Sequence, residues 1–376
     1  PQEAQAIAAI TETFALKDAI IDEIDPETGT EVMRPITYIL GDTFHSTPLV
    51  VGTPPNTNFF AANKFVEIGD SDATCESGDN TGYRCFFRKH QHRRRVLFYG
   101  SNEGMVHAVD AGSYHTSGTD PITGRTLEEE FDNGTGKEMF SLIPRSVMGK
   151  VRELAEGTTH KFTVDGPLVA GDVFIDPVDD GGAFPNENDR EWRTVLVGGL
   201  REGGRGVYAI DITQPDHLNS DFIPDDQGNY IGSCTAAYSA TDCGPVPFPA
   251  QLWEFTDSVY DPVAGNVRLD EDANGTPDLG DTWSTPSLGL IEVCKGGSAC
   301  KANDPDPALR DDVESRFVAV FGGGMDVDSK NTPSGALSGL TADGSALRGN
   351  WIYMVDIETG QVLYKRQVIG AVASEI

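Results

Sequence analysis

The sequence predicts an all-β fold built from one repeated unit, because a single pattern of strands and glycine turns recurs along the 376 residues. In each copy an apolar strand leads through a glycine-rich turn to a second apolar strand that ends in aspartate. The copies lie at 95–110, at 192–211 and, with an insertion, at 316–356. Apolar runs rich in β-branched and aromatic residues and bounded by glycines are typical of hairpins. Repetition of such a hairpin sets the architecture of the chain.

Each hairpin is flanked by two more strand-like segments. A strand that opens on a proline motif precedes the hairpin, at 45–52, 164–171 and 283–290. A fourth strand follows it, at 136–143, 251–255 and 360–365. Four antiparallel strands per repeated unit are the composition of a β-propeller blade, and the blades begin near residues 45, 164 and 283. A blade buries both faces against its neighbours, which explains apolar runs that do not alternate strictly.

The two ends of the chain fall outside these units. Apolar residues at helical spacing predict one amphipathic helix that begins at Pro1 and reaches about Ile24. We therefore divide the chain into an N-terminal helix and linker, residues 1–37, and a propeller domain, residues 38–376. A second short helix is expected at 144–156, between the first two blades. The last residues resemble the start of another strand, so the sequence predicts an incomplete propeller that ends as a further blade begins.

The charge balance restricts the possible partners. The chain has 28 basic and 59 acidic residues and a net charge of −31. Nucleic acid is excluded as a partner, because phosphate binding needs a basic surface. The charge fits an extracellular surface, a cation-binding surface, or solubility alone. No apolar run is long enough to predict a membrane span.

The cysteines point to an oxidising compartment. All six fall in close pairs within polar insertions: Cys75 with Cys85, Cys234 with Cys243, and Cys294 with Cys300. None of the pairs has the Cys-x-x-Cys spacing of a zinc site. Local disulfides in a secreted protein are the simplest interpretation, and free thiols in a cytosolic protein are the alternative.

The most specific motif for chemistry is an acidic loop at 270–281. Oxygen-bearing side chains occupy its first, third, fifth, ninth and twelfth positions, and the seventh offers a backbone carbonyl. The predicted ligands are Asp270, Asp272, Asn274, Thr276, Asp278 and Asp281. Gly275 stands sixth, where a calcium loop needs a sharp turn. The twelfth position holds Asp281 instead of the longer Glu, so bidentate closure is in doubt. The sequence predicts a Ca²⁺ site here, and an acidic surface loop is the alternative.

Other motifs are weaker. His90 and His92 would face one side of a strand and could meet a metal, but no third ligand is evident, so a solvated basic entry to a strand is favoured. The oxygen cluster at 326–331 is better explained as a turn. The glycine clusters at 203–206 and 322–324 precede neither Lys-Ser/Thr nor a helix, so they are hairpin and close-approach glycines and not phosphate loops. No catalytic motif of a hydrolase, zinc protease or kinase occurs, so no catalytic residue is predicted.

The repeats resemble a known family. The similar segments keep their order along the chain: 41–52, 97–110, 138–145, 162–172, 193–211 and 280–286. Segments such as Gly-Asp-Thr-Phe-His-Ser-Thr-Pro at 41–48 look like the C-terminal propeller of type IV pilus tip adhesins of the PilY/PilC type. The resemblance implies a quinoprotein-like propeller that is not an enzyme. It also implies a secreted protein at the pilus tip that acts with minor pilins in assembly, opposes retraction and contributes to adhesion to a host or abiotic surface.

The resemblance leaves the acidic loop without an inherited role. The family's regulatory calcium loop lies in a blade after the Ala-Ser-Glu stretch, where this sequence ends, so the loop at 270–281 occupies another place. Three functions are therefore compared: a docking module that holds calcium, a quinone-dependent dehydrogenase on the same blades, and a scaffold that binds through its insertions. The dehydrogenase is disfavoured because each of the four tryptophans is better explained as a strand or core residue and no vicinal cysteine pair occurs.

Overall fold

The structure is a computed structural model. It describes residues 18–24, 31–37, 41–55, 82–120, 122–156, 160–177, 185–215, 248–256, 259–261, 266–268, 278–295, 313–325 and 348–368. Predictions about residues 1–17, the first part of the acidic loop and the cluster at 326–331 lie outside them.

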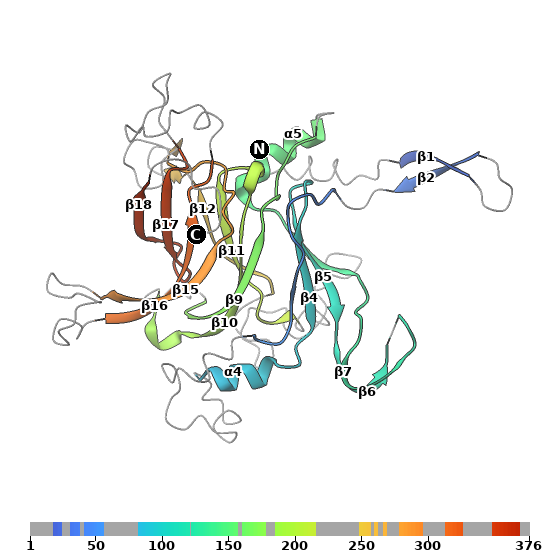
Figure 1. The fold of residues 1–376 in the computed structure, drawn as a ribbon, viewed down its shortest axis with the longest axis horizontal. Coiled ribbons are helices and arrows are strands. Elements are labelled where there is room, and N and C mark those ends of the chain that lie inside the picture. Colours follow the sequence, from blue (N-terminus) through green and yellow to red (C-terminus); the bar gives the residue numbers. More distant parts are fainter. Residues whose placement is uncertain are drawn as a thin grey trace.

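Three four-stranded antiparallel sheets form the body of the molecule (Figure 1). Blade 1 has the order β3 (Leu49–Val51), β4 (Arg95–Gly100), β5 (Val106–Gly112) and β8 (Glu138–Leu142). Blade 2 has the order β9 (Leu168–Ile175), β10 (Glu191–Gly199), β11 (Gly206–Asp211) and β12 (Ala250–Thr256). Blade 3 has the order β15 (Ser287–Cys294), β16 (Val313–Gly322), β17 (Trp351–Asp356) and β18 (Val362–Gln367). The predicted all-β fold, with four strands in each repeated unit, is confirmed.

Blade 2 is buried on both faces, and its sequence shows why. In β10 the alternating residues Val195 and Val197 belong to one hydrophobic cluster, while Leu196 between them belongs to the other. In β11 the same alternation separates Val207 from Tyr208. Because successive side chains of a strand point to opposite faces, an unbroken apolar run supplies two cores at once. The apolar runs that the sequence analysis noted are explained by this two-sided burial.

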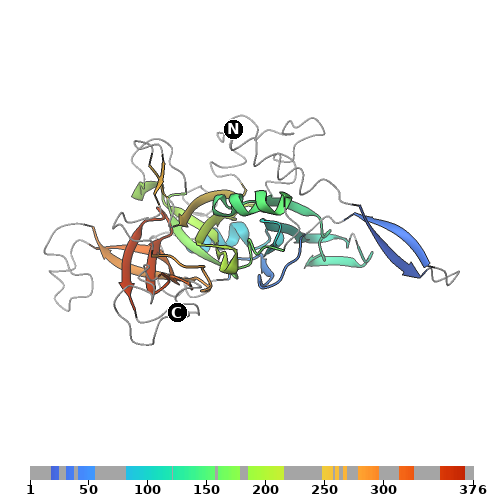
Figure 2. The same ribbon diagram turned by 90° about the horizontal axis from the view of Figure 1, so that it is seen from above.

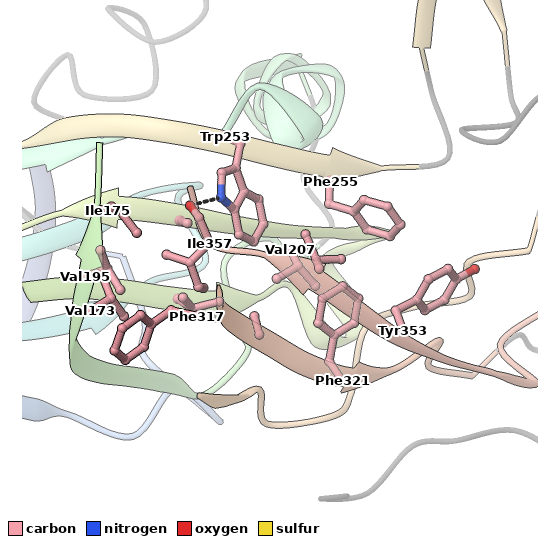
Figure 3. Packing of buried hydrophobic residues seen from close by; sticks show 14 of the residues in the cluster. Val173, Ile175, Val195, Val207, Trp253, Phe255, Phe317, Phe321, Tyr353 and Ile357 are labelled. Atoms are coloured by element: carbon pink, nitrogen blue, oxygen red, sulfur yellow. Dashed lines mark hydrogen bonds between the residues drawn. The ribbon is translucent and has the colours of Figure 1, made fainter. Parts of the chain in front are cut away.

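The two clusters join neighbouring blades. One lies between blades 2 and 3 and includes Phe255 and Trp253 of blade 2 with Phe321 and Tyr353 of blade 3 (Figure 3). The Trp253 indole N–H donates to the carbonyl of Ile357 across this interface at 2.9 Å. The other cluster joins blade 1 to blade 2. The first strands pack most closely, since β9 contacts β3 and β4 on one side and β15 and β16 on the other.

Short elements fill the connections. Blade 1 carries an inserted hairpin of β6 (Tyr114–Thr119) and β7 (Thr126–Phe131), and another hairpin, β13 (Val259–Asp261) with β14 (Asn266–Arg268), follows blade 2. The predicted helix between the first two blades is confirmed as η1 (Arg145–Val147) and α5 (Met148–Glu156). The remaining short helices are α4 (Tyr83–His90), η2 (Glu187–Asp189) and η3 (Arg201–Gly203).

The predicted N-terminal helix is wrong over its last residues. Residues Asp18–Ile24 form strand β1, which pairs antiparallel with β2 (Glu31–Thr37). Isoleucines at 20, 21 and 24 favour a strand, because β-branched side chains fit a pleated surface better than a helix. This hairpin stands away from the three sheets in both views (Figures 1 and 2).

The segment before β4 also differs from its prediction. His90 ends helix α4 and lies buried beside Phe86, with ring centroids 4.8 Å apart, whereas His92 stacks on Tyr114 at 3.8 Å. The two imidazoles therefore do not share one face of a strand. The basic run is not merely solvated either, because the buried Arg93 guanidinium donates to the Thr194 hydroxyl of blade 2 at 2.8 Å.

Candidate functional site

Two of the six predicted calcium ligands lie within the described part of the chain. The buried Asp278 carboxylate pairs with the Lys365 ammonium of β18, and the Asp278 carbonyl accepts the N–H of Gly349 at 2.8 Å. Asp281 forms a main-chain bridge with Met325. Asp270, Asp272, Asn274 and Thr276 lie outside the described residues. The calcium site therefore stays a prediction, and in the described ranges no three His, Cys, Asp or Glu side chains are placed to hold a metal ion.

A different cluster lies where the three blades meet. The loops that lead into the first strands of blades 1, 2 and 3 approach one another and the turn between β10 and β11. We call this cluster the junction site, and it consists of Phe44, His45, Asp165, Arg201 and Trp283. Loops held on packed sheets are common places for binding residues, because the scaffold fixes their positions.

A buried carboxylate links the first two blades at this site. The Asp165 side chain is fully buried, and one of its oxygens accepts the backbone N–H of His45 at 3.1 Å. The other oxygen lies 2.6 Å from His45 Nδ1. The His45 side chain keeps 27% of its surface exposed, so the imidazole joins the buried carboxylate to solvent. This pairing fixes the orientation of the ring.

Burial, together with the negative charges of Glu202 and Asp42, raises the pKa of Asp165 to about 7. Both causes favour the neutral carboxylic acid over the carboxylate, because burial removes water from the charged form and the nearby negative charges repel it. The carboxyl group therefore changes its charge near neutral pH.

The turn that carries Arg201 is fixed between two loops. Leu200 and Arg201 donate their N–H groups to the Thr282 hydroxyl and carbonyl of blade 3, at 2.9 and 3.0 Å. On the other side Gly203 approaches the chain so closely that a Cβ would lie 1.5 Å from the Thr163 carbonyl oxygen. The prediction that these glycines allow close approach is confirmed at this position.

Arg201 has a strained backbone and an unusual environment. Its φ is +53°, a left-handed conformation that side chains other than glycine adopt at a cost of about 1–2 kcal/mol. Its guanidinium carbon lies 4.3 Å from the ring centre of Trp283. The closest carboxylate contact is Asp165 at 3.9 Å, which is too long for a hydrogen bond. Burial lowers the pKa of Arg201, which the charge of Glu202 opposes.

Aromatic rings surround the exposed side of His45. Phe44 lies edge-on to His45 at 4.2 Å and 6.0 Å from Phe162, and the Phe44 side chain is 67% exposed. His160 packs edge-on against Phe162 at 4.9 Å and lies 3.1 Å from the Asp42 carboxylate. A large exposed aromatic ring beside polar groups is typical of binding surfaces.

A second ionisable cluster lies within blade 1. His107 of β5 is buried, and its two ring nitrogens lie 2.7 Å from Glu103 and 2.5 Å from Glu138 of β8. Burial opposes protonation, but the hydrogen bonds to the two glutamates raise the pKa of His107 overall. This cluster joins β5 to β8 and to the preceding turn, which is a structural role.

The sequence carries signals for the junction site within its repeats. The proline-containing strand openings were recognised as repeats, yet they also carry Asp165, His45 and Trp283. The arginine within the glycine cluster was read only as part of a turn. Of the four tryptophans, Trp192, Trp253 and Trp351 lie in strands as expected, whereas Trp283 lies in a loop beneath Arg201.

The cysteine prediction is met in part. Cys85 in α4 and Cys294 at the end of β15 are both disulfide-bonded. Their partners lie outside the described residues, so the predicted pairings with Cys75 and Cys300 stay predictions.

Comparison with known proteins finds a similar family for the first part of the chain. Residues 40–224, which span blade 1 and three strands of blade 2, match the model of the PilY1 beta-propeller domain. This part of the chain is similar to the PilY1 propeller family. A type IV pilus biogenesis factor PilY1 homolog of Xylella fastidiosa is 31% identical over 181 residues, which are 48% of this chain and 11% of the relative. The type IV pilus biogenesis factor PilY1 of Pseudomonas aeruginosa, strain UCBPP-PA14, is 30% identical over 202 residues, which are 53% of this chain and 13% of the relative.

The matched region therefore spans about a tenth of the length of these relatives. Among solved structures, the crystal structure of the Pseudomonas aeruginosa PilY1 C-terminal domain is similar with a TM-score of 0.37 and 18% identity, over 85% of this chain and 37% of that one. The match of residues 40–224 to the family model confirms the resemblance seen in the sequence and the propeller-type blades. In the described part of the chain, no helix is both long and apolar enough to cross a lipid bilayer.

We predict that Gly203→Ala destabilises the junction site. The added methyl group would overlap the Thr163 carbonyl, and the backbone must shift to relieve it, so the free energy of unfolding should fall by about 1–3 kcal/mol. Gly149→Ala is the matched control, because Gly149 lies exposed in α5 with no atom within 4 Å of the added Cβ. The control should gain about 0.5–1 kcal/mol. Urea unfolding measures both, and equal midpoints for Gly203→Ala and the parent would contradict the close approach.

We also predict that the Asp165 carboxyl titrates near pH 7 in the folded protein. Because its pKa is raised above the ordinary value of 3.8, the folded state holds this proton longer than the unfolded state. The contribution of Asp165 to stability is therefore largest below pH 3.8 and falls as the pH rises toward 7. Carboxyl ¹³C NMR gives the titration directly. Glu202→Gln should lower the Asp165 pKa by removing a negative charge, and a parent value near 3.8 would refute the prediction.

Proposed function

We propose that the chain is the propeller of a non-enzymatic type IV pilus tip protein. The observation that carries this proposal is the match of residues 40–224 to the PilY1 beta-propeller domain, together with curated relatives that are named type IV pilus biogenesis factors. On this proposal the propeller docks on minor pilins, supports pilus assembly, counters retraction and contributes to adhesion. The protein is secreted through the periplasm to the pilus tip.

The fold supports a docking role physically. Face-to-face packing of the blades leaves their loops and insertions at the surface, supported by a rigid core. The inserted hairpin β6–β7 is one such element. Its turn is fixed by the Asp120 carboxylate, which accepts the N–H groups of Ile122 and Thr123 at 2.9 and 2.7 Å. Ile122 stands 62% exposed there. A rigid platform with exposed apolar tips suits binding of another protein.

The test of this function uses the full-length protein in its own cells. Deletion of the gene should abolish or strongly reduce surface pili, and a copy that lacks only residues 38–376 should be exported but fail to restore them. If the propeller mainly counters retraction, pili should return when the retraction motor is also removed. Full restoration of pili by the truncated copy would overturn the proposal.

Calcium binding is the second part of the proposal and rests on the acidic loop at 270–281. We predict that Asp270→Ala with Asp272→Ala lowers calcium affinity at least about tenfold, because two of the six to eight hard oxygen ligands are lost. Asp326→Ala with Asp328→Ala is the control with equal charge loss at the weaker oxygen cluster, and it should leave affinity unchanged. Isothermal titration calorimetry with CaCl₂ measures both. Equal affinities for the two double variants would show that the loop does not bind calcium.

A further inference from the structure

Arg201 is a cation without a hydrogen-bonding partner among the described residues. Its guanidinium rests over Trp283 at 4.3 Å and stays 3.9 Å from the Asp165 carboxylate. The side chain keeps 21% of its surface exposed, so part of it is open to solvent. We propose that the junction site binds a carboxylate carried on an apolar group, with Arg201 as its anchor. This proposal goes beyond the pilus function and does not depend on it.

The backbone around Arg201 shows that the position of this side chain is imposed. A non-glycine residue at φ +53° persists only where the surroundings hold it, and such strain gathers at binding and catalytic sites. Here Thr282 accepts the Arg201 N–H, and the turn is pressed against Thr163 by Gly203. Glycine at 201 would remove the strain, but it would also remove the cation. The strain is therefore consistent with a need for the guanidinium at this point.

The local charges favour a monoanion over a phosphate. The guanidinium lies in a neighbourhood that contains the carboxyl groups of Asp165, Glu202 and Asp42 against the single imidazole of His160. A doubly charged ligand would be repelled by these groups, and phosphate sites generally combine several cationic or backbone donors. A carboxylate matches the planar fork of one arginine in a bidentate pair. The chemistry of the site therefore selects a single carboxylate.

The aromatic rings favour an apolar body on that carboxylate. Phe44 exposes two-thirds of its side chain while contacting His45 at 4.2 Å, and His45 reaches the same Asp165 oxygen that Arg201 approaches. A series of contacts therefore connects the exposed Phe44 ring, through His45 and Asp165, to the Arg201 guanidinium. An apolar group on Phe44 would lose water from both surfaces, which adds affinity to the charge pair.

The site has contributions from all three blades. Phe44 and His45 precede β3, Asp165 and Arg201 belong to blade 2, and Trp283 precedes β15. A ligand held here would be clamped by loops that are far apart in sequence. The carboxylate has two sources, a free small organic acid or the carboxyl terminus of a polypeptide that ends in an apolar residue, and the test separates them.

The test measures binding to the full chain by NMR titration and calorimetry. Phenylacetate is the free acid, phenylacetamide is its uncharged match, and inorganic phosphate is the competing anion. A short peptide ending in Phe with a free carboxylate, compared with its C-terminal amide, represents the polypeptide source. Phenylacetate should bind at least about tenfold more tightly than phenylacetamide or phosphate. Tighter binding of the free-ended peptide than of phenylacetate would assign the polypeptide source, and the reverse would assign the small acid.

Variants identify the anchor. Arg201→Gln should weaken phenylacetate binding at least about tenfold, while Arg205→Gln, in the same turn, should change it less than about twofold. Phe44→Ala alters an exposed side chain, so the fold should be kept, and phenylacetate binding should fall several-fold while acetate binding stays constant. If Arg201→Gln fails to fold, the proposal is tested by the ratio of the parent protein's affinities for phenylacetate and phenylacetamide. No binding of either carboxylate up to about 10 mM, equal binding of acid and amide, or unchanged binding by Arg201→Gln would overturn the proposal.

Discussion

Burial of both faces of blade 2 is the constraint on which the rest of the structure depends. Its central strands β10 and β11 divide their side chains between two hydrophobic clusters, so blade 1 and blade 3 pack on opposite sides of the same sheet. Burying one large apolar side chain contributes about 1.5–3 kcal/mol. If only one face of blade 2 were packed against another blade, one of these two clusters would be lost. Each sheet is therefore stabilised by packing against its neighbour. This mutual burial holds the loops between the blades in fixed positions.

The same packing accounts for the strain at the junction site. A left-handed arginine costs about 1–2 kcal/mol, which is no more than the burial of one core side chain returns. The Leu200 and Arg201 N–H groups find acceptors because blade 3 presents Thr282 at the right distance, and the turn fits only because Gly203 has no Cβ. Local strain is thus supported by contacts among three sheets. The turn would not hold this conformation in an isolated hairpin.

The fold could be predicted best from the repeated segments of the sequence. The glycine-bounded apolar runs located the hairpins of all three blades, because each run must supply two buried faces and ends at a tight turn. The N-terminal pattern was misleading over Asp18–Ile24, since isoleucines one, three and four positions apart do not distinguish a helix from a strand in so short a segment. Helix α4 was missed because its apolar residues, Phe86 and Phe87, are interspersed with arginines and lysine. The junction site could not be predicted, because its residues come from loops that only the packed blades bring together.

Arg201 differs from the described arginines that form buried pairs with a carboxylate. The chain has 28 basic residues against 59 acidic ones, so a cation within it normally finds a carboxylate. Arg193 holds both oxygens of Asp211, at 2.6 and 3.1 Å, and Arg190 likewise holds Glu358 at 2.8 and 2.9 Å. In these buried pairs each guanidinium donates to both carboxylate oxygens, and removal of either partner would leave an uncompensated buried charge. Arg201 is instead held over the Trp283 ring, as Arg95 is over Phe131, and its guanidinium stays 3.9 Å from the Asp165 carboxylate, beyond hydrogen-bond reach. In a molecule with so many available carboxylates, an arginine kept apart from them is available for the carboxylate of another molecule.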